Sequence, residues 1–280
     1  MLGSPISHSL SPALHAAAYA ALGLTWWRYD AIECDETGLA AVLDRCGPDW
    51  AGLSLTMPLK RTVLPLLDRI DPLARHVGCA NTVVFAAAQR LGYNTDVAGM
   101  VGALAENGID GRRGPVGPAL IIGAGATACA ALAALRDLGE RSVAVALRDA
   151  DRAEHLLAAA SSLDIAVNLG RYEPRALDNA RLVISTVPAG AADVFAEIFP
   201  SLVSPPQAVL DVVYHPWPTA LAMAAQQAGA VLVSGFDLLL HQAGRQVELM
   251  TGRPAPLAAM RRAGAAQLAA RIGDAQVGGD

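Results

Sequence analysis

Hydroxyl-bearing residues crowd the start of the chain, in the stretch GSPISHSLSPALH. Serine stands at alternate positions, Ser7, Ser9 and Ser11, a pattern that a turn alone does not need. Because a serine hydroxyl both donates and accepts hydrogen bonds, the stretch suits a small molecule that carries hydroxyls or a carboxylate. The pair Ser11-Pro12 also predicts a helix start, with Ser11 as the N-cap and proline at the first helical position.

A lysine and an aspartate follow at two further predicted helix starts, in SLTMPLK and GYNTDVAG. Pro58 fits the first position of a short helix, which puts Lys60 in its first turn. The positive end of the helix dipole favours proton release from Lys60, and a nearby carboxylate such as Asp96 opposes it. Such a pair can exchange a proton with a substrate oxygen while a hydride moves elsewhere. Taken alone, the two residues are explained more simply as a surface lysine and an aspartate helix cap.

A glycine turn in the second half, GAGATA, spaces Gly123, Gly125 and Ala128 as G-x-G-x-x-A. The apolar run ALII precedes it and an apolar helical stretch follows. In a dinucleotide-binding turn the first glycine permits the tight turn and the second lets the backbone approach a pyrophosphate. The small third residue lets helix and strand pack closely. An ordinary strand-to-helix turn is the alternative, but the flanking strand and helix favour a dinucleotide.

Two arginines stand where the next predicted strand ends, in LRDADR. In dinucleotide-binding folds this position meets the adenosine ribose, where a carboxylate accepts the 2′-hydroxyl of NAD and an arginine pairs with the 2′-phosphate of NADP. Arg148 and Arg152 therefore favour NADP, whereas Asp149 between them favours NAD. Two solvated arginines near a helix start would indicate neither cofactor.

Strand-like and helix-like stretches alternate from Trp26 onward, which predicts the α/β class with a mostly parallel sheet. The stretch NTVVFAAAQRLGYNTD breaks this order and predicts a hairpin that turns at residues 88–90, followed by a helix over 97–107. The next stretch, NGIDGRRGPVGP, is rich in glycine and proline and predicts a linker between two domains.

The second half predicts a doubly wound domain of five or six strands over residues 118–235. Its strands are expected in ALII, SVAVAL, ARLVIST, QAVLDVVY and AVLVSG. Two helices are expected after it, the first ending at Gly252 and the second beginning after Pro256.

Composition excludes several classes of protein. The 280 residues are 53% hydrophobic and 17% charged, with a net charge of −5, which argues for buried cores and against disorder. Since no basic run occurs, nucleic acid is not an expected partner. The cysteines are scattered without a C-x-x-C motif, so we expect reduced thiols, a cytoplasmic location and no metal site. No secretory leader or membrane-spanning run is evident, and no membrane association is predicted.

Eight blocks, in order, resemble the successive motifs of shikimate dehydrogenases across nearly the whole chain: GSPISHSLSPALH, GLSLTMPLK, GCANTV, GYNTDVAG, GAGATA, STVPAG, DVVYHPWPTAL and SGFDLLLHQAGRQVELMTG. The resemblance implies a substrate domain over residues 1–105, completed by 236–275, and an NADP-binding Rossmann domain over 116–235. It implies NADPH-dependent reduction of 3-dehydroshikimate to shikimate, in chorismate and aromatic amino-acid biosynthesis, by a monomer or homodimer.

The resemblance also assigns roles to single residues. Lys60 and Asp96 match the catalytic pair, and Ser9 and Ser11 match two serines that hold the substrate carboxylate, which would account for the hydroxyls at the start. Besides these four residues, the substrate-binding positions are Thr56, Asn81, Tyr214 and Gln242. The cofactor-binding positions are Gly123, Ala124, Gly125, Ala126, Arg148, Arg152, Thr186 and Gly235.

The chain departs from the family pattern at several places. Ala126 replaces a glycine of the phosphate loop, and Leu147 and Asp149 replace the Asn and Thr of an Asn-Arg-Thr stretch, so 2′-phosphate recognition rests more on the arginines. Few apolar residues precede the first block. We therefore expect that adding residues encoded upstream, where an open frame exists, would raise the melting temperature through new ladder bonds and burial.

Two other functions compete with this interpretation. A relative that acts on quinate or aminoshikimate would differ by one ring substituent, and Ser11, where quinate-using relatives often carry Thr, favours shikimate. A non-catalytic sensor is the second alternative, because such domains also occur in transcriptional regulators. The presence of both Lys60 and Asp96, with no appended DNA-binding segment, favours an enzyme.

Overall fold

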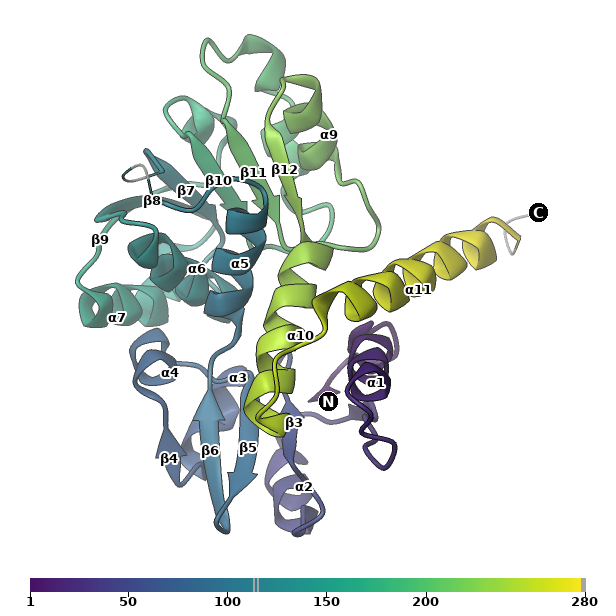
Figure 1. Cartoon of the computed structure of the whole chain (residues 1–280). Helices are drawn as coiled ribbons and strands as arrows, with labels where there is room; N and C mark the ends of the chain where they lie inside the picture. Colours follow the sequence, from purple (N-terminus) through teal and green to yellow (C-terminus); the bar gives the residue numbers. More distant parts are fainter. Residues whose placement is uncertain (113, 115, 278–280) are drawn as a thin grey trace. The chain divides into compact units, whose positions relative to one another are not determined.

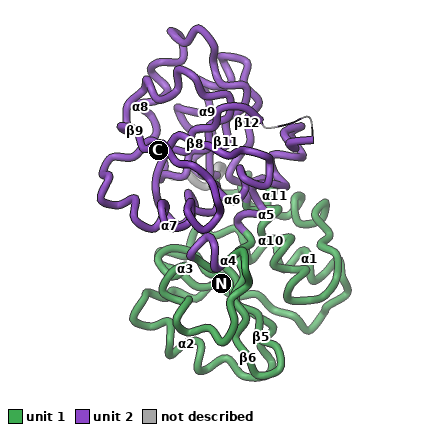
Figure 2. The backbone as a smooth tube through the Cα atoms, turned by 90° about the vertical axis from the view of Figure 1, so that its left-hand side faces the viewer, with its two compact units in different colours: residues 1–74, 79–95, 239–280 green, residues 75–78, 96–238 purple. Residues whose placement is uncertain are grey.

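The structure, a computed structural model, describes residues 1–112, 114 and 116–277, with the side chains of 272–277 left aside. The chain forms two compact units, shown in separate colours in Figure 2. Unit 1 comprises Met1–Ala74, Cys79–Thr95 and the described residues from Leu239 onward. Unit 2 comprises Arg75–Gly78 and Asp96–Leu238. Each unit has its own sheet and core.

Unit 1 contains a parallel strand pair and a four-stranded sheet, and Figure 1 labels the four strands of the sheet, β3 to β6. The pair is β1 (Leu2–Gly3) with β2 (Ile32–Glu33). The sheet has the order β3-β5-β6-β4, with strands β3 (Gly52–Ser54), β4 (Arg69–Ile70), β5 (Thr82–Ala86) and β6 (Gln89–Tyr93). Strand β5 is antiparallel to both neighbours and only β4 runs parallel to β6. The expectation of a mostly parallel sheet is therefore wrong for this unit, because a hairpin forms its centre.

The hairpin turns earlier than expected. Ala87 and Ala88 connect β5 to β6 with φ angles of 49° and 59°, in the left-handed region that two-residue hairpin turns require. Residues 89 and 90, predicted as part of the turn, belong to the strand. Alanine gives no signal for this conformation, whereas Asn-Gly would have done so.

Unit 1 also contains the helices α1 (Ser11–Ala21), α2 (Leu39–Arg45), α3 (Leu59–Thr62), part of α4 (Pro72–Val77), most of α10 (Gly235–Thr251) and α11 (Leu257–Val277), of which α1 and α11 pack against each other. The C-terminal helices end and begin where predicted, and Gly252 has the positive φ of 68° typical of a residue that follows a helix. The predicted N-cap is shifted by one residue, since Ser11 is already helical and Leu10 precedes the helix.

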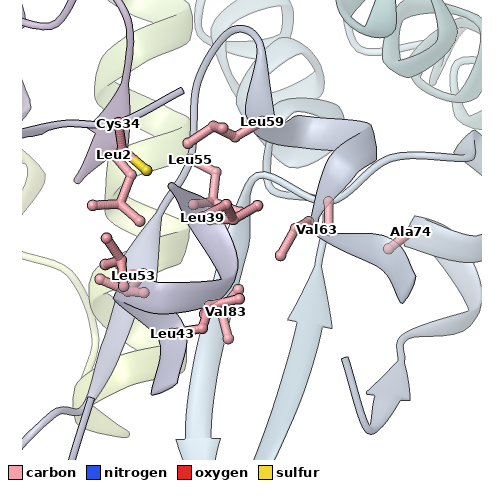
Figure 3. Packing of buried hydrophobic residues seen from close by; sticks show 12 residues of the cluster. Leu2, Cys34, Leu39, Leu43, Leu53, Leu55, Leu59, Val63, Ala74 and Val83 are labelled. Atoms are coloured by element: carbon pink, nitrogen blue, oxygen red, sulfur yellow. The ribbon is translucent and has the colours of Figure 1, made fainter. Parts of the chain in front are cut away.

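The core of unit 1 packs strand side chains against α2 and α3 (Figure 3). Leu53 and Leu55 are buried in this cluster together with Leu39 and Val83. Because side chains alternate across a strand, Ser54 faces the other side, toward α10. The hydrophobic core thus fixes which face of β3 presents hydroxyls.

Unit 2 is a doubly wound domain, as predicted (Figure 1). Its sheet is six-stranded, in the order β12-β11-β10-β7-β8-β9, and every pairing is parallel. The strands are β7 (Ala119–Ile122), β8 (Ser142–Leu147), β9 (Ala166–Arg171), β10 (Leu182–Ser185), β11 (Ala208–Asp211) and β12 (Val231–Ser234). The strand order reverses between β7 and β10, where open α/β sheets bind their ligands at the carboxyl ends.

The helices of unit 2 are α5 (Asp96–Glu106), α6 (Ala126–Asp137), α7 (Glu154–Leu163), α8 (Asp193–Ala196) and α9 (Ala220–Gln227). Helix α5 packs against α6, so the boundary between the units falls ahead of it, at Thr95 and Asp96, rather than in the linker at 107–118. Across the part of the chain that the structure describes, no helix combines the length and the apolar composition that crossing a membrane takes.

Candidate active site

The residues singled out in the sequence divide between the two units. Unit 1 carries six predicted substrate-binding positions, Ser9, Ser11, Thr56, Lys60, Asn81 and Gln242. Unit 2 carries Asp96, Tyr214 and all eight predicted cofactor-binding positions. Within unit 1 the structure joins Asn81 to Gln242, and within unit 2 Gly123, Arg148 and Thr186 follow the carboxyl ends of β7, β8 and β10.

Asn81 is the centre of a buried polar cluster in unit 1. Its Oδ1 accepts hydrogen bonds from the backbone N–H of Thr95 at 2.8 Å and from the hydroxyl of Thr82 at 3.0 Å. Its Nδ2 donates to the Oγ1 of Thr95 at 3.0 Å and to the Oε1 of Gln242 at 3.3 Å. Asn81 and Gln242, which lie far apart in the sequence, therefore form one buried polar surface with defined donors and acceptors.

A second residue of α10, Gln246, extends this cluster one helical turn further. Its Oε1 accepts from the hydroxyl of Ser54 at 2.9 Å and lies 3.3 Å from Nε2 of His15. Its Nε2 donates to the hydroxyl of Thr82 at 3.1 Å. Because every polar atom of the Gln246 side chain is bonded, this residue fixes the orientation of Ser54 and of α10 beneath the predicted substrate site.

His15 is fully buried behind the serine stretch. Its ring stacks on Tyr29 with centroids 3.8 Å apart, and its Nδ1 lies 3.2 Å from the hydroxyl of Tyr19. Since Gln246 Oε1 can only accept, His15 donates from Nε2 and accepts from Tyr19 at Nδ1. Burial lowers the pKa of His15 to about 3, from 6.5. The imidazole is thus a neutral structural group of the site.

We expect His15 to make the free energy of unfolding depend on pH. The unfolded chain binds a proton at this position below pH 6.5 while the folded chain does not, so stability is complete above that pH and falls as the pH drops toward 3. The contribution of His15 to the free energy of unfolding falls by roughly 1 kcal/mol between pH 6.5 and 5.5. Below pH 5.5 it falls by about 1.4 kcal/mol for each further pH unit. Chemical denaturation of the parent chain and of His15→Gln over pH 4.5–7.5 measures the difference. Parallel pH profiles in the two proteins would contradict the neutral assignment.

The two predicted carboxylate-binding serines lie at the start of α1. Ser11 is buried, and its backbone N–H donates to the hydroxyl oxygen of Ser9 at 3.1 Å. Arg271 of α11 donates to the backbone oxygens of His8 and Ser9, at 2.7 and 3.1 Å. A guanidinium thus holds the serine loop from the far end of the sequence, a role that no motif indicated.

Lys60 lies in α3, which begins directly after Pro58, as predicted within one residue. Its backbone oxygen accepts from the N–H of Ala80 at 2.8 Å, which ties α3 to the residue next to Asn81. The helix has only four residues, so its dipole is smaller than the sequence argument assumed. Thr56 is half-buried just ahead of it.

The glycine turn of unit 2 has the geometry expected for a phosphate loop. Gly123 has a φ of 109°, and a Cβ there would lie 2.6 Å from Oγ1 of Thr186, so only glycine fits. A Cβ on Gly125, by contrast, would meet no described atom within 4 Å, and this residue precedes α6. Ala128 is fully buried, consistent with close packing of helix on strand. The turn thus offers open backbone at a helix N-terminus, where a phosphate binds.

The two arginines near this turn differ in how firmly they are held. Arg148 Nη2 donates to the backbone oxygen of Ala191 at 3.4 Å. Arg152 Nε lies 4.0 Å from Oδ2 of Asp149, and the Arg152 side chain is 84% exposed. Asp149 uses its other oxygen to cap the 3₁₀ helix η2 (Ala150–Ala153), accepting from the N–H of Asp151 at 3.0 Å. The carboxylate that favours NAD is therefore already engaged locally.

Tyr214 lies in a loop whose two ends are joined by one buried carboxylate. Asp211 accepts from the N–H of Val213 at 3.2 Å and from the hydroxyl of Thr219 at 2.8 Å, and burial raises its pKa. Thr219 also caps α9. Gly235 packs against the same loop, since a Cβ there would lie 2.1 Å from the backbone oxygen of Val212.

Several residues of the site escaped the sequence analysis, namely His15, Ser54, Thr82, Thr95, Asp211, Gln246 and Arg271. One signal was available for Gln246, which follows Gln242 by four residues and so shares its helix face. Ser54 precedes Thr56 by two residues, a spacing that in an extended segment indicates one shared face. Partners such as Arg271 depend on tertiary packing and leave no local pattern.

Comparisons with known proteins identify relatives over nearly the whole chain. A family model described as shikimate dehydrogenase substrate binding domain matches residues 1–83, and one described as shikimate 5′-dehydrogenase C-terminal domain matches residues 235–263. The chain is 36% identical over 272 residues to the NADP(+) shikimate dehydrogenase of Moorella thermoacetica, covering 94% of this chain and 90% of that protein.

Solved structures give the same result over almost the full length. The shikimate dehydrogenase of Mycobacterium tuberculosis superimposes with a TM-score of 0.84 at 41% identity, covering 95% of this chain and 97% of the other. The Thermus thermophilus enzyme in complex with NADP(H) and shikimate gives a TM-score of 0.80 at 32% identity, with 94% and 96% covered.

Proposed function

Because the chain belongs to the shikimate dehydrogenase family, we propose that it catalyses the NADPH-dependent reduction of 3-dehydroshikimate to shikimate. The observation that carries the proposal is the presence in one chain of a buried amide and hydroxyl cluster around Asn81 and of an open glycine turn before α6. We assign substrate binding to unit 1 and cofactor binding to unit 2, in a cytoplasmic monomer or homodimer.

Unit 1 supplies the partners that the substrate needs. Ser9 and Ser11 bind the carboxylate, and Thr56, Asn81 and Gln242 bind the ring oxygens. Tyr214 is the remaining substrate-binding position that the motif order assigns. Such a dense set of polar partners favours a polyhydroxylated acid, because an analogue that lacks one hydroxyl leaves a buried group unpaired. Ser11, where quinate-using relatives often carry Thr, favours shikimate over quinate, and quinate and aminoshikimate remain the alternative substrates.

The reaction needs a hydride on the ketone carbon and a proton on its oxygen. When bound, NADPH supplies the hydride. Lys60 and Asp96 act on the proton: as the carbon–oxygen double bond is reduced, the electron pair that moves to the oxygen is neutralised by a proton delivered from Lys60. Asp96 keeps that lysine charged and accepts a hydrogen bond from the ring hydroxyl. In the reverse direction the same pair removes the proton.

The chain's own residues at the glycine turn fit the pyrophosphate of a dinucleotide. Gly123, Ala124, Gly125 and Ala126 form the turn that meets the pyrophosphate, and Ala126 replaces a glycine at the first position of α6 without blocking the open face at Gly125. Thr186 donates to the backbone oxygen of Ile122 at 2.8 Å and so closes the turn from the β10 side. Gly235 shapes the loop that holds Tyr214.

Initial rates with a panel of substrates test the proposed activity. Shikimate, quinate and aminoshikimate are each oxidised with NADP and with NAD, and the kcat/KM values are compared. We expect shikimate with NADP to give the highest value. Binding of shikimate without turnover would support a sensor instead, and a higher kcat/KM for quinate would move the chain to the alternative substrate.

We expect NADP to be preferred over NAD by at least about tenfold in kcat/KM, equivalent to roughly 1.4 kcal/mol. Charge-assisted hydrogen bonds to a phosphate contribute roughly 1.5 to 3 kcal/mol each, and two arginines outweigh the repulsion from Asp149. Arg148→Ala should lose most of the preference and leave kcat/KM with NAD nearly unchanged. Equal kcat/KM values with NADP and NAD in the unmodified enzyme would contradict this preference. They would indicate that Asp149 binds the ribose of NAD and that the reaction is NAD-linked.

A further inference from the structure

A tyrosine on the edge strand of unit 2 lies directly against Arg148. The guanidinium carbon is 4.8 Å from the centre of the Tyr172 ring, within the range of a cation–π contact. The hydroxyl of Tyr172 donates to the backbone oxygen of Ala191 at 2.5 Å, the same oxygen that accepts from Arg148 at 3.4 Å. Arginine and tyrosine thus share one carbonyl of the loop between β10 and α8.

The backbone makes this meeting a consequence of strand register. Leu147 at the end of β8 pairs with Arg171 at the end of β9 in the parallel sheet. The next residues on the two strands, Arg148 and Tyr172, are therefore neighbours at the carboxyl edge, where cofactors bind in such sheets. The strand register therefore places the two residues side by side.

Tyr172 is itself anchored in the core of unit 2. Its ring meets Phe195 edge-to-face, with centroids 4.9 Å apart and planes at 79°, and Phe195 is fully buried. Burial also raises the pKa of Tyr172, which keeps its hydroxyl a donor toward Ala191. The tyrosine is a fixed platform, whereas Arg152 has only a distant, exposed partner in Asp149.

We propose that Tyr172 is a positioning residue for cofactor selectivity, whose ring and hydroxyl hold the Arg148 guanidinium ready to pair with the 2′-phosphate. A long arginine side chain loses rotamer entropy when it binds, and a platform that already restricts the guanidinium reduces that cost. The centre of the Tyr172 ring lies 4.8 Å from the guanidinium carbon, and the Nη2 of Arg148 is held by the Ala191 carbonyl. The inference rests on the proposed function, in which Arg148 recognises the 2′-phosphate.

The test compares Tyr172→Leu and Tyr172→Phe with the parent enzyme. We expect Tyr172→Leu to lower the NADP:NAD ratio of kcat/KM by about three- to tenfold, through the NADP value, with the NAD value within about twofold. Tyr172→Phe keeps the ring. It should therefore lower the logarithm of the NADP:NAD ratio by less than half as much as Tyr172→Leu does. Thermal melting of each variant checks that unit 2 remains folded.

Ligand binding without turnover gives an independent measurement. Calorimetric titration with adenosine 2′,5′-bisphosphate and with adenosine 5′-monophosphate reports the contribution of the 2′-phosphate alone. Tyr172→Leu should weaken binding of the bisphosphate by the same three- to tenfold and leave the monophosphate unchanged. Equal weakening of both ligands would show a general structural role and overturn the proposal.

The double variant separates this inference from the proposed role of Arg148. In an Arg148→Ala background, Tyr172→Leu should change the NADP:NAD ratio no further, because the two residues act through one guanidinium. If Arg148→Ala lowers the ratio and Tyr172→Leu does not, the positioning role is wrong while the proposed function stands. If Arg148→Ala itself leaves the ratio unchanged, the assignment of the 2′-phosphate site fails.

Discussion

Replacing Lys60 with alanine should lower kcat by about 10² to 10⁴, equivalent to about 2.7 to 5.5 kcal/mol of transition-state stabilisation. The ketone oxygen develops negative charge as the hydride arrives, and the variant has no ammonium to donate a proton to it. The KM for shikimate should change far less, because the variant leaves in place the contacts that we propose for Ser9, Ser11, Asn81 and Gln242 with the ring and the carboxylate. Steady-state kinetics in both reaction directions measure the effect on kcat and the effect on KM separately.

Two further variants make the Lys60 result specific. Arg69→Ala removes an exposed cation from β4 of the same unit and should leave kcat unchanged, which controls for net charge. Asp96→Asn keeps the size of the side chain at the start of α5 and should also lower kcat strongly. A near-normal kcat in Lys60→Ala, with NADPH saturating, would remove the lysine from the reaction.

The sequence predicted the parts of the molecule that depend on local pattern. The turn at Gly123 and the doubly wound unit were recognisable because strand, glycine spacing and helix are contiguous. Lys60 and Asp96 were identified as a possible pair at helix starts, and both lie in the first turn of a helix. The predicted substrate-binding and cofactor-binding residues came from the order of the motif blocks, which no single motif could provide.

What the sequence could not predict depends on contacts between distant segments. Strand β9 has mostly exposed residues and so lacked the apolar run that marked the other strands of unit 2. The hairpin turn at Ala87 and Ala88 lacks the residues that announce a left-handed conformation. Tyr172 carried no motif at all, and only its register with β8 brings it to Arg148.

Gly235 was assigned to the cofactor site from the motif order, and the structure gives it a steric role besides. It is the first residue of α10, and its N–H donates to the backbone oxygen of Val213 at 3.3 Å. A Cβ at this position would lie 2.1 Å from the oxygen and 2.4 Å from the carbon of the Val212 carbonyl. Because the obstacle is backbone and not a flexible side chain, the helix start or the loop must shift.

Gly235→Ala should therefore destabilise the protein by about 3 kcal/mol, near the upper end for overpacking, and lower the melting temperature by roughly 6 to 12 °C. The shift also moves the loop that carries Tyr214, so KM for shikimate should rise together with the loss of stability. Gly47→Ala is the matched control, since a Cβ on Gly47 would meet no described atom within 4 Å and the φ of Gly47 is not positive. The melting temperature of this variant should stay within about 2 °C of the parent value. If the two variants melt together, Gly235 is not sterically required, and its place in the motif must be explained by direct contact with the cofactor alone.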